Sequence, residues 1–139
     1  MIHLSLAAYR RRRDFSVLKQ YLMANIYSAK SVAIIVWTLS FSSYIFDETV
    51  TVAKSRMNHH QAVALGEALL KSKVLTIVSV NEALQRESWE FFKNHEDKGF
   101  SFTDCTSFMI MKAHNLNQVL AFDHHFTQMG FTVNKRISP

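Results

Sequence analysis

The chain has 139 residues, of which 48% are hydrophobic, with only three glycines and one proline. This composition excludes a disordered or collagen-like chain and suits one folded domain, which we expect to span residues 1–139. The formal net charge of +5 favours a polyanionic partner such as a nucleic acid, although a basic protein without such a partner would carry the same charge.

The cysteine content and the start of the chain bear on the compartment. Cys105 is the sole cysteine, so no disulfide can form within the chain, as is typical of a reducing cytoplasm. Apolar residues come first and arginines follow, the reverse of a secretory signal. No apolar run approaches the roughly 20 residues of a membrane span. We therefore expect a cytoplasmic protein that does not enter a membrane.

Short apolar segments and helical patterns alternate along the chain. In the first half, Ile2, Leu4 and Leu6 predict a strand, and the β-branched run at 32–37 predicts a buried one. Helical spacing of apolar residues predicts helices over 13–29, 44–57 and 58–72, the last starting at Asn58. Such strands, separated by helices, are typical of a parallel sheet covered on both faces.

The second half continues the alternation. A strand is predicted at 74–80, then a helix over 81–95 capped by Asn81, a turn at 96–99 and a helix from Ser101 to about residue 114. A short apolar strand at 119–122, a helical turn at 124–129 and a strand at 131–133 follow. Ligands of parallel sheets bind at the carboxyl ends of the strands, so acids there are of interest.

Glu48 lies within the predicted helix over 44–57, where helical spacing places it beside Ile45 and Val52 on a half-apolar face. A carboxylate there is costly to bury unless it is paired or binds a cation. Its neighbour Asp47 shares a face with Lys54, which is typical of solvated surface.

Two further acids have two interpretations each. Asp104 comes three residues after Ser101, as in a capping box, but it also shares a face with Phe108 and so points partly inward. Asp123 directly follows the apolar strand at 119–122. It could cap the next helical turn, or it could be an acid at the carboxyl end of a parallel strand.

Carboxylates gathered at one place would suit Mg²⁺ or Mn²⁺, which prefer oxygen ligands. Such ions activate water and neutralise charge on a reacting phosphodiester. The histidines show no spacing typical of zinc. Of the seven, only His124 or His125, next to Asp123, could face such a site, and ordinary structural or surface roles are favoured for all seven. Cys105 lies on an apolar stripe and is expected in the core.

The stretch 99–108, Gly-Phe-Ser-Phe-Thr-Asp-Cys-Thr-Ser-Phe, and the stretch 119–131, beginning Val-Leu-Ala-Phe-Asp-His-His-Phe, resemble the signature of the PIN-domain family, in the branch of VapC-type toxins. The stretch 44–51, Tyr-Ile-Phe-Asp-Glu-Thr-Val-Thr, resembles the family's middle motif. The resemblance implies an α/β/α sandwich with a central, mainly parallel sheet. It also implies endonucleolytic cleavage of RNA with Mg²⁺ or Mn²⁺.

By position, the resemblance assigns the catalytic and metal-binding carboxylates to Glu48, Asp104 and Asp123. Ser101 and Thr103 would orient Asp104 or contact a bound water. The family's toxins are commonly homodimers and are neutralised by an antitoxin protein, so both partners are expected beside RNA. The basic residues expected to guide RNA are Arg10, Arg11, Arg12, Arg13 and Lys54.

The first thirteen residues depart from the family pattern. The family begins with a strand that ends in an aspartate followed by Thr or Ser, whereas residues 1–13 contain no acid. Two functions therefore stay open: a metal-dependent endoribonuclease, or a PIN-fold module that binds RNA or a protein without cleavage. A plain helical interaction protein is disfavoured by the predicted strands.

Overall fold

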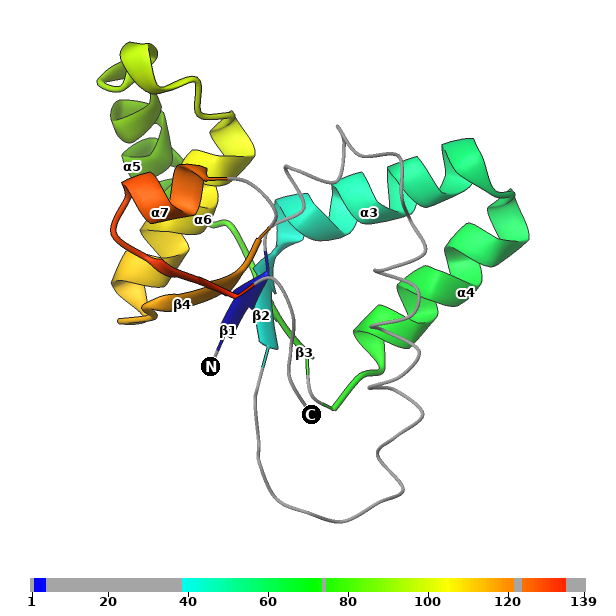
Figure 1. Cartoon of the computed structure of the whole chain (residues 1–139). Coiled ribbons are helices and arrows are strands. Elements are labelled where there is room, and N and C mark those ends of the chain that lie inside the picture. The colour runs from blue at the N-terminus through cyan, green and yellow to red at the C-terminus, as the bar shows by residue number, and fades with distance from the viewer. Residues whose placement is uncertain (1, 5–38, 74, 122–123, 135–139) are drawn as a thin grey trace.

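A parallel sheet forms the centre of the computed structural model, which describes residues 2–4, 39–73, 75–121 and 124–134 (Figure 1). Within these residues the sheet has five strands in the order β3-β2-β1-β4-β5, and every neighbouring pair is parallel. The central strand is β1, whose His3 is opposite Ser40 on one side and Val119 on the other. The strands are β1 (Ile2–Leu4), β2 (Leu39–Ser42), β3 (Leu75–Val78), β4 (Gln118–Leu120) and β5 (Thr132–Asn134).

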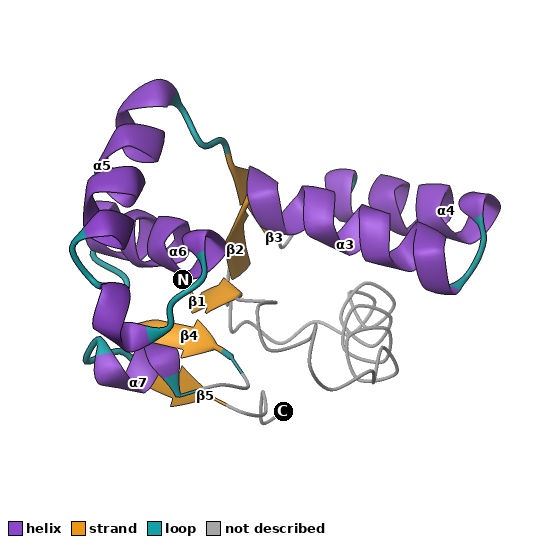
Figure 2. Ribbon diagram, turned by 90° about the horizontal axis from the view of Figure 1, so that it is seen from above, coloured by secondary structure: helices purple, strands orange, loops and turns teal. Residues whose placement is uncertain are grey.

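Helices lie on both sides of this sheet. The pair α3 and α4 is on one side of the strands, and α5, α6 and α7 are on the other (Figures 1 and 2). This arrangement is the α/β/α sandwich with a mainly parallel sheet that the sequence predicted. The helices are α3 (Ser43–Arg56), α4 (His59–Leu70), α5 (Glu82–Lys93), α6 (Phe102–Ala113) and α7 (His125–Gln128), with a short 3-10 helix η2 (Glu96–Lys98) before α6.

Side-chain caps explain where the longer helices begin. The predicted caps Asn58, Asn81 and Ser101 are confirmed: each side chain accepts a hydrogen bond from the backbone N–H three residues on, at 2.9, 2.9 and 3.1 Å. Ser42, the last residue of β2, caps α3 in the same way. Each cap fixes the direction in which a helix leaves its preceding segment.

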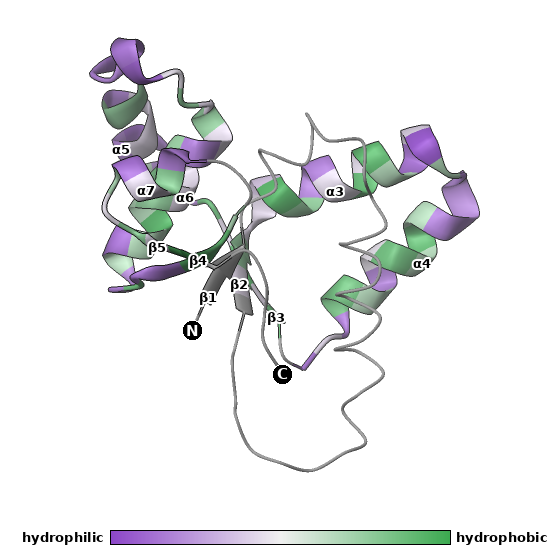
Figure 3. Ribbon diagram, in the orientation of Figure 1, coloured by the Kyte–Doolittle hydropathy of each residue, from purple (hydrophilic) through white to green (hydrophobic). Residues whose placement is uncertain are grey.

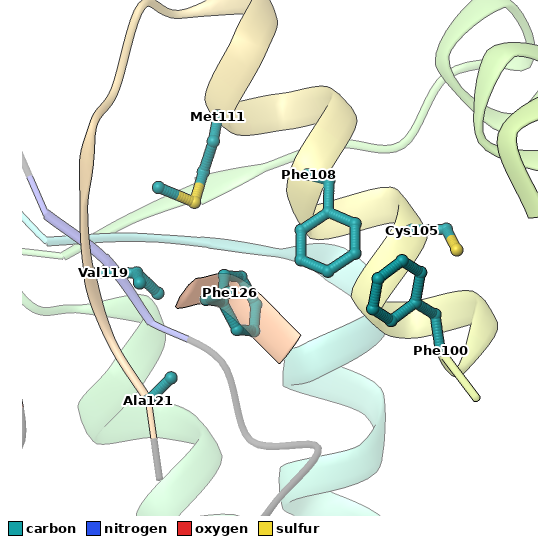
Figure 4. Packing of buried hydrophobic residues seen from close by; sticks show 7 residues of the cluster. All are labelled: Phe100, Cys105, Phe108, Met111, Val119, Ala121 and Phe126. Atoms are coloured by element: carbon teal, nitrogen blue, oxygen red, sulfur yellow. The ribbon is translucent and has the colours of Figure 1, made fainter. Parts of the chain in front are cut away.

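One cluster of buried side chains joins α6 to β4 and α7. Phe108 lies at its centre, and its ring meets the rings of Phe100 and Phe126 edge-on, with centroids 5.0 and 4.9 Å apart (Figure 4). Cys105 belongs to this core, as predicted. By contrast, α5 lies on the outside and carries many hydrophilic residues (Figure 3). Ser88 is its one buried residue. The buried members are Phe100, Cys105, Phe108, Met111, Val119, Ala121 and Phe126.

The strand β2 was not predicted from the sequence. It spans Leu39–Ser42, and its Ser40 and Ser42 are fully buried. The strand predicted at 32–37 lies outside the described residues, as does the helix predicted over 13–29. A central strand is fixed by its neighbours on both sides, so it tolerates buried serines that local propensity disfavours. No helix within the described ranges is long and apolar enough to cross a membrane.

Candidate active site at the carboxyl edge of the sheet

The order of the strands points to one edge of the sheet. From β1 the chain builds β2 and β3 on one side, then returns to build β4 and β5 on the other. In open parallel sheets, ligands bind beyond the carboxyl ends of the strands, where the order reverses. That point lies beyond the ends of β1 and β4, and in sequence Asp123 comes three residues after Leu120, the last residue of β4.

Asp104 is the buried acid of this region, with 1% of its surface exposed. It lies in the first turn of α6, and its Oδ2 accepts hydrogen bonds from the Ser101 backbone N–H and from the Ser101 hydroxyl, each at 2.9 Å. Its own backbone N–H donates to Ser101 Oγ at 3.1 Å. The sequence left two interpretations of Asp104 open, a capping box and an inward orientation, and the structure shows both. The positive end of the helix dipole also favours a carboxylate here.

His125 joins Asp104 to the segment that follows β4. Its Nδ1 lies 3.3 Å from Asp104 Oδ2, and 14% of the His125 side chain is exposed. The ring stands edge-on to Phe100, with centroids 5.3 Å apart. His124, in contrast, is exposed and occupies the N-cap position of α7. Asp104 therefore lies beside the start of α7, although the two segments are far apart in sequence.

The first turn of α3 reaches the same place from the other side. Tyr44 in α3 and Phe102 in α6 have ring centroids 6.1 Å apart, and the Val80 backbone N–H donates to Ser43 Oγ at 3.2 Å. Glu48 is one turn beyond Tyr44 on the same face of α3 and is half-buried. The start of α3, the start of α6 and the end of β3 therefore meet at this edge.

The remaining predicted site residues fall into two groups. Ser101 is exposed and contacts Asp104, Thr103 is half-buried in the first turn of α6, and Lys54 is exposed near the end of α3. Asp47, which the sequence placed on the solvated surface, is exposed. The others lie outside the described residues; these are Asp123, Arg10, Arg11, Arg12 and Arg13. The sequence named His124 or His125 for their closeness to Asp123 without choosing between them, and the contact of His125 with Asp104 could not be foreseen.

The donor chemistry of this edge suits a hard divalent cation. Asp104 and Glu48 offer carboxylate oxygens, which Mg²⁺ and Mn²⁺ prefer, and Asp104 already has one oxygen fixed by neighbouring donors. Within the described ranges, no three His, Cys, Asp or Glu side chains gather into a group that could hold a metal ion. Asp123, the third predicted acid, lies outside these ranges.

Cys105 is not a nucleophile of this site. It is fully buried, and burial raises the pKa of its thiol to about 11, with the charge of Asp104 adding to the rise. A thiol with this pKa stays protonated near neutral pH, whereas a nucleophilic cysteine needs the thiolate. The buried thiol is therefore unsuited to act as a nucleophile here.

Comparisons with known proteins identify the family of this chain. The family model described as "PIN domain" matches residues 6–132. The "23S rRNA-specific endonuclease VapC20" of Mycobacterium tuberculosis is 33% identical over 90 residues, which cover 65% of this chain and 68% of that protein. A "VapC ribonuclease" of Archaeoglobus fulgidus is 30% identical over 115 residues, which cover 77% and 72% of the two chains.

A solved structure shares the fold. The crystal structure of Mycobacterium tuberculosis VapC20, titled a sarcin-ricin loop cleaving toxin, superposes with a TM-score of 0.71 at 24% identity, covering 95% of this chain and 97% of that one. Fold, family match and relatives therefore agree. The chain belongs to the PIN-domain family, in its branch of VapC-type toxin ribonucleases.

Proposed function

We propose that this chain cleaves structured RNA internally with the help of Mg²⁺ or Mn²⁺, as the toxin of a toxin–antitoxin pair. The observation that carries the proposal is the burial of Asp104, 1% exposed, at the carboxyl edge of the sheet. A capping box stabilises a helix start without needing burial, and a buried carboxylate is costly unless it is hydrogen-bonded, paired or bound to a cation. Asp104 accepts hydrogen bonds from Ser101 and contacts His125, and a cation would be a further favourable partner for its charge.

The three predicted acids, Glu48, Asp104 and Asp123, would together hold the cation. When bound, the cation would make a water molecule more acidic and neutralise negative charge on the phosphodiester. Ser101 would keep Asp104 oriented through its two contacts with Oδ2, and Thr103, two residues after Ser101, would contact a water in the site. The half-buried position of Glu48, one turn from Tyr44, supports its inclusion.

The proposed partners follow from charge and from the relatives. The net charge of +5 favours RNA, because basic side chains release counterions from phosphates. The relatives' names, a 23S rRNA-specific endonuclease and a sarcin-ricin loop cleaving toxin, support a structured ribosomal RNA as the substrate class. An antitoxin protein and a second copy of the chain are the expected protein partners. The basic side chains proposed to guide RNA are Arg10, Arg11, Arg12, Arg13 and Lys54.

A second function is favoured by one sequence observation. Residues 1–13 contain no acid, where the resemblance leads us to expect an aspartate at the end of the first strand. With three acids rather than four, the cation would be held by fewer charges. The alternative is therefore a PIN-fold module that binds RNA or a protein partner without cutting.

The experiment that tests the proposal compares cleavage of a structured RNA by the wild type, Asp104→Asn and Asp97→Asn, with Mn²⁺ or with EDTA. Asp97 is the matched control because it is an exposed acid on η2. We expect cleavage that needs Mn²⁺ and falls at least ~100-fold in Asp104→Asn, since cation chemistry supplies several kcal/mol of transition-state stabilisation. Full-rate cleavage by Asp104→Asn would reject the assignment. A folded wild type that binds RNA but never cuts would establish the non-cleaving module.

A further inference from the structure

We infer that His125 is a positioning residue that fixes the orientation of the Asp104 carboxylate for the cation. This inference rests on the proposed function. Its basis is the contact between His125 Nδ1 and Asp104 Oδ2 at 3.3 Å, made between side chains that are 14% and 1% exposed. Two polar side chains so shielded from water interact more strongly than the same pair at the surface.

The direction of this hydrogen bond follows from the chemistry of the groups. An ionised carboxylate only accepts, so Nδ1 must carry the proton and donate it. The same oxygen, Oδ2, also accepts from the backbone N–H and the hydroxyl of Ser101 at 2.9 Å. Since a carboxylate has about four lone-pair sites over its two oxygens, three donors saturate Oδ2. This set of donors therefore fixes the orientation of the carboxylate.

The two residues that donate to Asp104 Oδ2 have different structural roles. Ser101 is three positions before Asp104 and belongs to the same helix start, so its contacts are local. His125 is 21 positions after Asp104 and two after Asp123 in the sequence. Its contact therefore joins the start of α7 to the start of α6, two elements that are far apart in sequence.

The core keeps the His125 ring in place. The ring packs edge-on against Phe100, at 5.3 Å and 74°, and lies 4.9 Å from the ring of His124. The next residue, Phe126, is fully buried and meets Phe108 edge-on at 4.9 Å. A donor carried on such a packed turn has little freedom to move, which is what orientation of a metal ligand requires.

The test uses four variants in the full-length chain. His125→Phe keeps the aromatic packing and removes the donor. His125→Asn places an amide N–H₂ close to the Nδ1 position, whereas His125→Gln places it one carbon further out. His124→Asn is the matched control, because His124 is the exposed neighbour. For each protein we would measure the Mn²⁺ dissociation constant by calorimetry, kcat and KM for RNA cleavage, and the melting temperature in EDTA.

We expect His125→Phe and His125→Gln to weaken Mn²⁺ binding by about 10- to 100-fold, which is the usual effect of losing the partner of a metal ligand. His125→Asn should bind Mn²⁺ within about threefold of wild type, and kcat should fall in the same order while KM for RNA stays constant. His124→Asn should match the wild type. If His125→Phe does not fold, the Mn²⁺ affinities of His125→Asn and His125→Gln are compared instead, and tighter binding by His125→Asn supports the positioning role.

The outcomes separate this inference from the proposed function. Wild-type Mn²⁺ affinity in folded His125→Phe, or in His125→Gln, would overturn the positioning role while the nuclease assignment stands. Equal losses in His125→Asn and His125→Phe would show that the ring rather than the donor matters, and would also overturn it. A wild type that neither binds Mn²⁺ nor cleaves RNA would overturn the proposed function, and the inference with it.

Discussion

The Ser101 hydroxyl donates to Asp104 Oδ2 at 2.9 Å and accepts from the Asp104 backbone N–H at 3.1 Å. The same pair of residues therefore starts α6 and orients the buried acid of the candidate site. Because one set of atoms serves both purposes, changes at Ser101 should alter stability and cleavage together. This coupling can be separated experimentally with a cap elsewhere in the chain.

Ser101→Ala should lower the free energy of unfolding by ~1 kcal/mol, the usual cost of losing an N-cap side chain. It should also lower the cleavage rate, because Asp104 Oδ2 loses the hydroxyl donor. The matched control is Asn58→Ala, which removes the cap of α4, where Asn58 accepts from the Gln61 N–H at 2.9 Å. Urea denaturation should show similar losses in both variants. An unchanged cleavage rate in Ser101→Ala would contradict the orienting role.

Glu48→Gln should reduce cleavage by at least ~100-fold while the fold is kept, because a neutral amide no longer offers the charge that a cation site needs. The control is its neighbour Asp47→Asn, which removes one negative charge from an exposed position on the same helix. Cleavage rates and circular dichroism of both variants check this prediction. Equal activity in the two variants would exclude Glu48 from the site.

The buried thiol of Cys105 predicts a pH dependence of stability. Burial, and then the charge of Asp104, raise the pKa of this thiol from its ordinary 9.0 to about 11. Below pH 9 the thiol is protonated in the folded and the unfolded chain, so its contribution is fully present. As the pH rises towards 11, only the unfolded chain ionises, and about 2 kcal/mol should be lost.

This prediction is measured by urea denaturation of the wild type and of Cys105→Ala across that pH range. The difference between the two proteins removes the titration of lysines and tyrosines. Alkylation offers a second readout: at about pH 8, iodoacetamide should modify Cys105 in urea but not in the native chain. Rapid modification of the native protein would contradict the buried, protonated thiol.

Local interactions made much of the fold predictable. Asn58, Asn81 and Ser101 each cap a helix through a hydrogen bond to a backbone N–H three residues away, and such a contact depends only on nearby sequence. The strands β3, β4 and β5 likewise fall close to their predicted segments, since short apolar runs mark them. The parallel sheet then follows from the alternation of strands and helices.

Features that depend on tertiary contacts could not be predicted from the sequence. The strand β2 contains the buried Ser40 and Ser42, and its place is set by pairing with β1 on one side and β3 on the other. His125 and Asp104 are 21 residues apart in the sequence, so no local sequence pattern predicts their contact. The sequence thus named Asp104 but could not identify its third hydrogen-bond donor, which only the packing of α7 against α6 supplies.

The central claim is that Glu48, Asp104 and Asp123 bind one divalent cation. The most direct measurement is a Mn²⁺ titration of ¹⁵N-labelled protein, because the paramagnetic ion broadens the signals of nearby amides. We expect the signals of Glu48, Asp104 and Asp123 to broaden first, and EDTA to restore them. Earlier broadening on α5, whose exposed acids are Glu82, Glu87 and Glu90, with Asp104 unaffected, would contradict the claim.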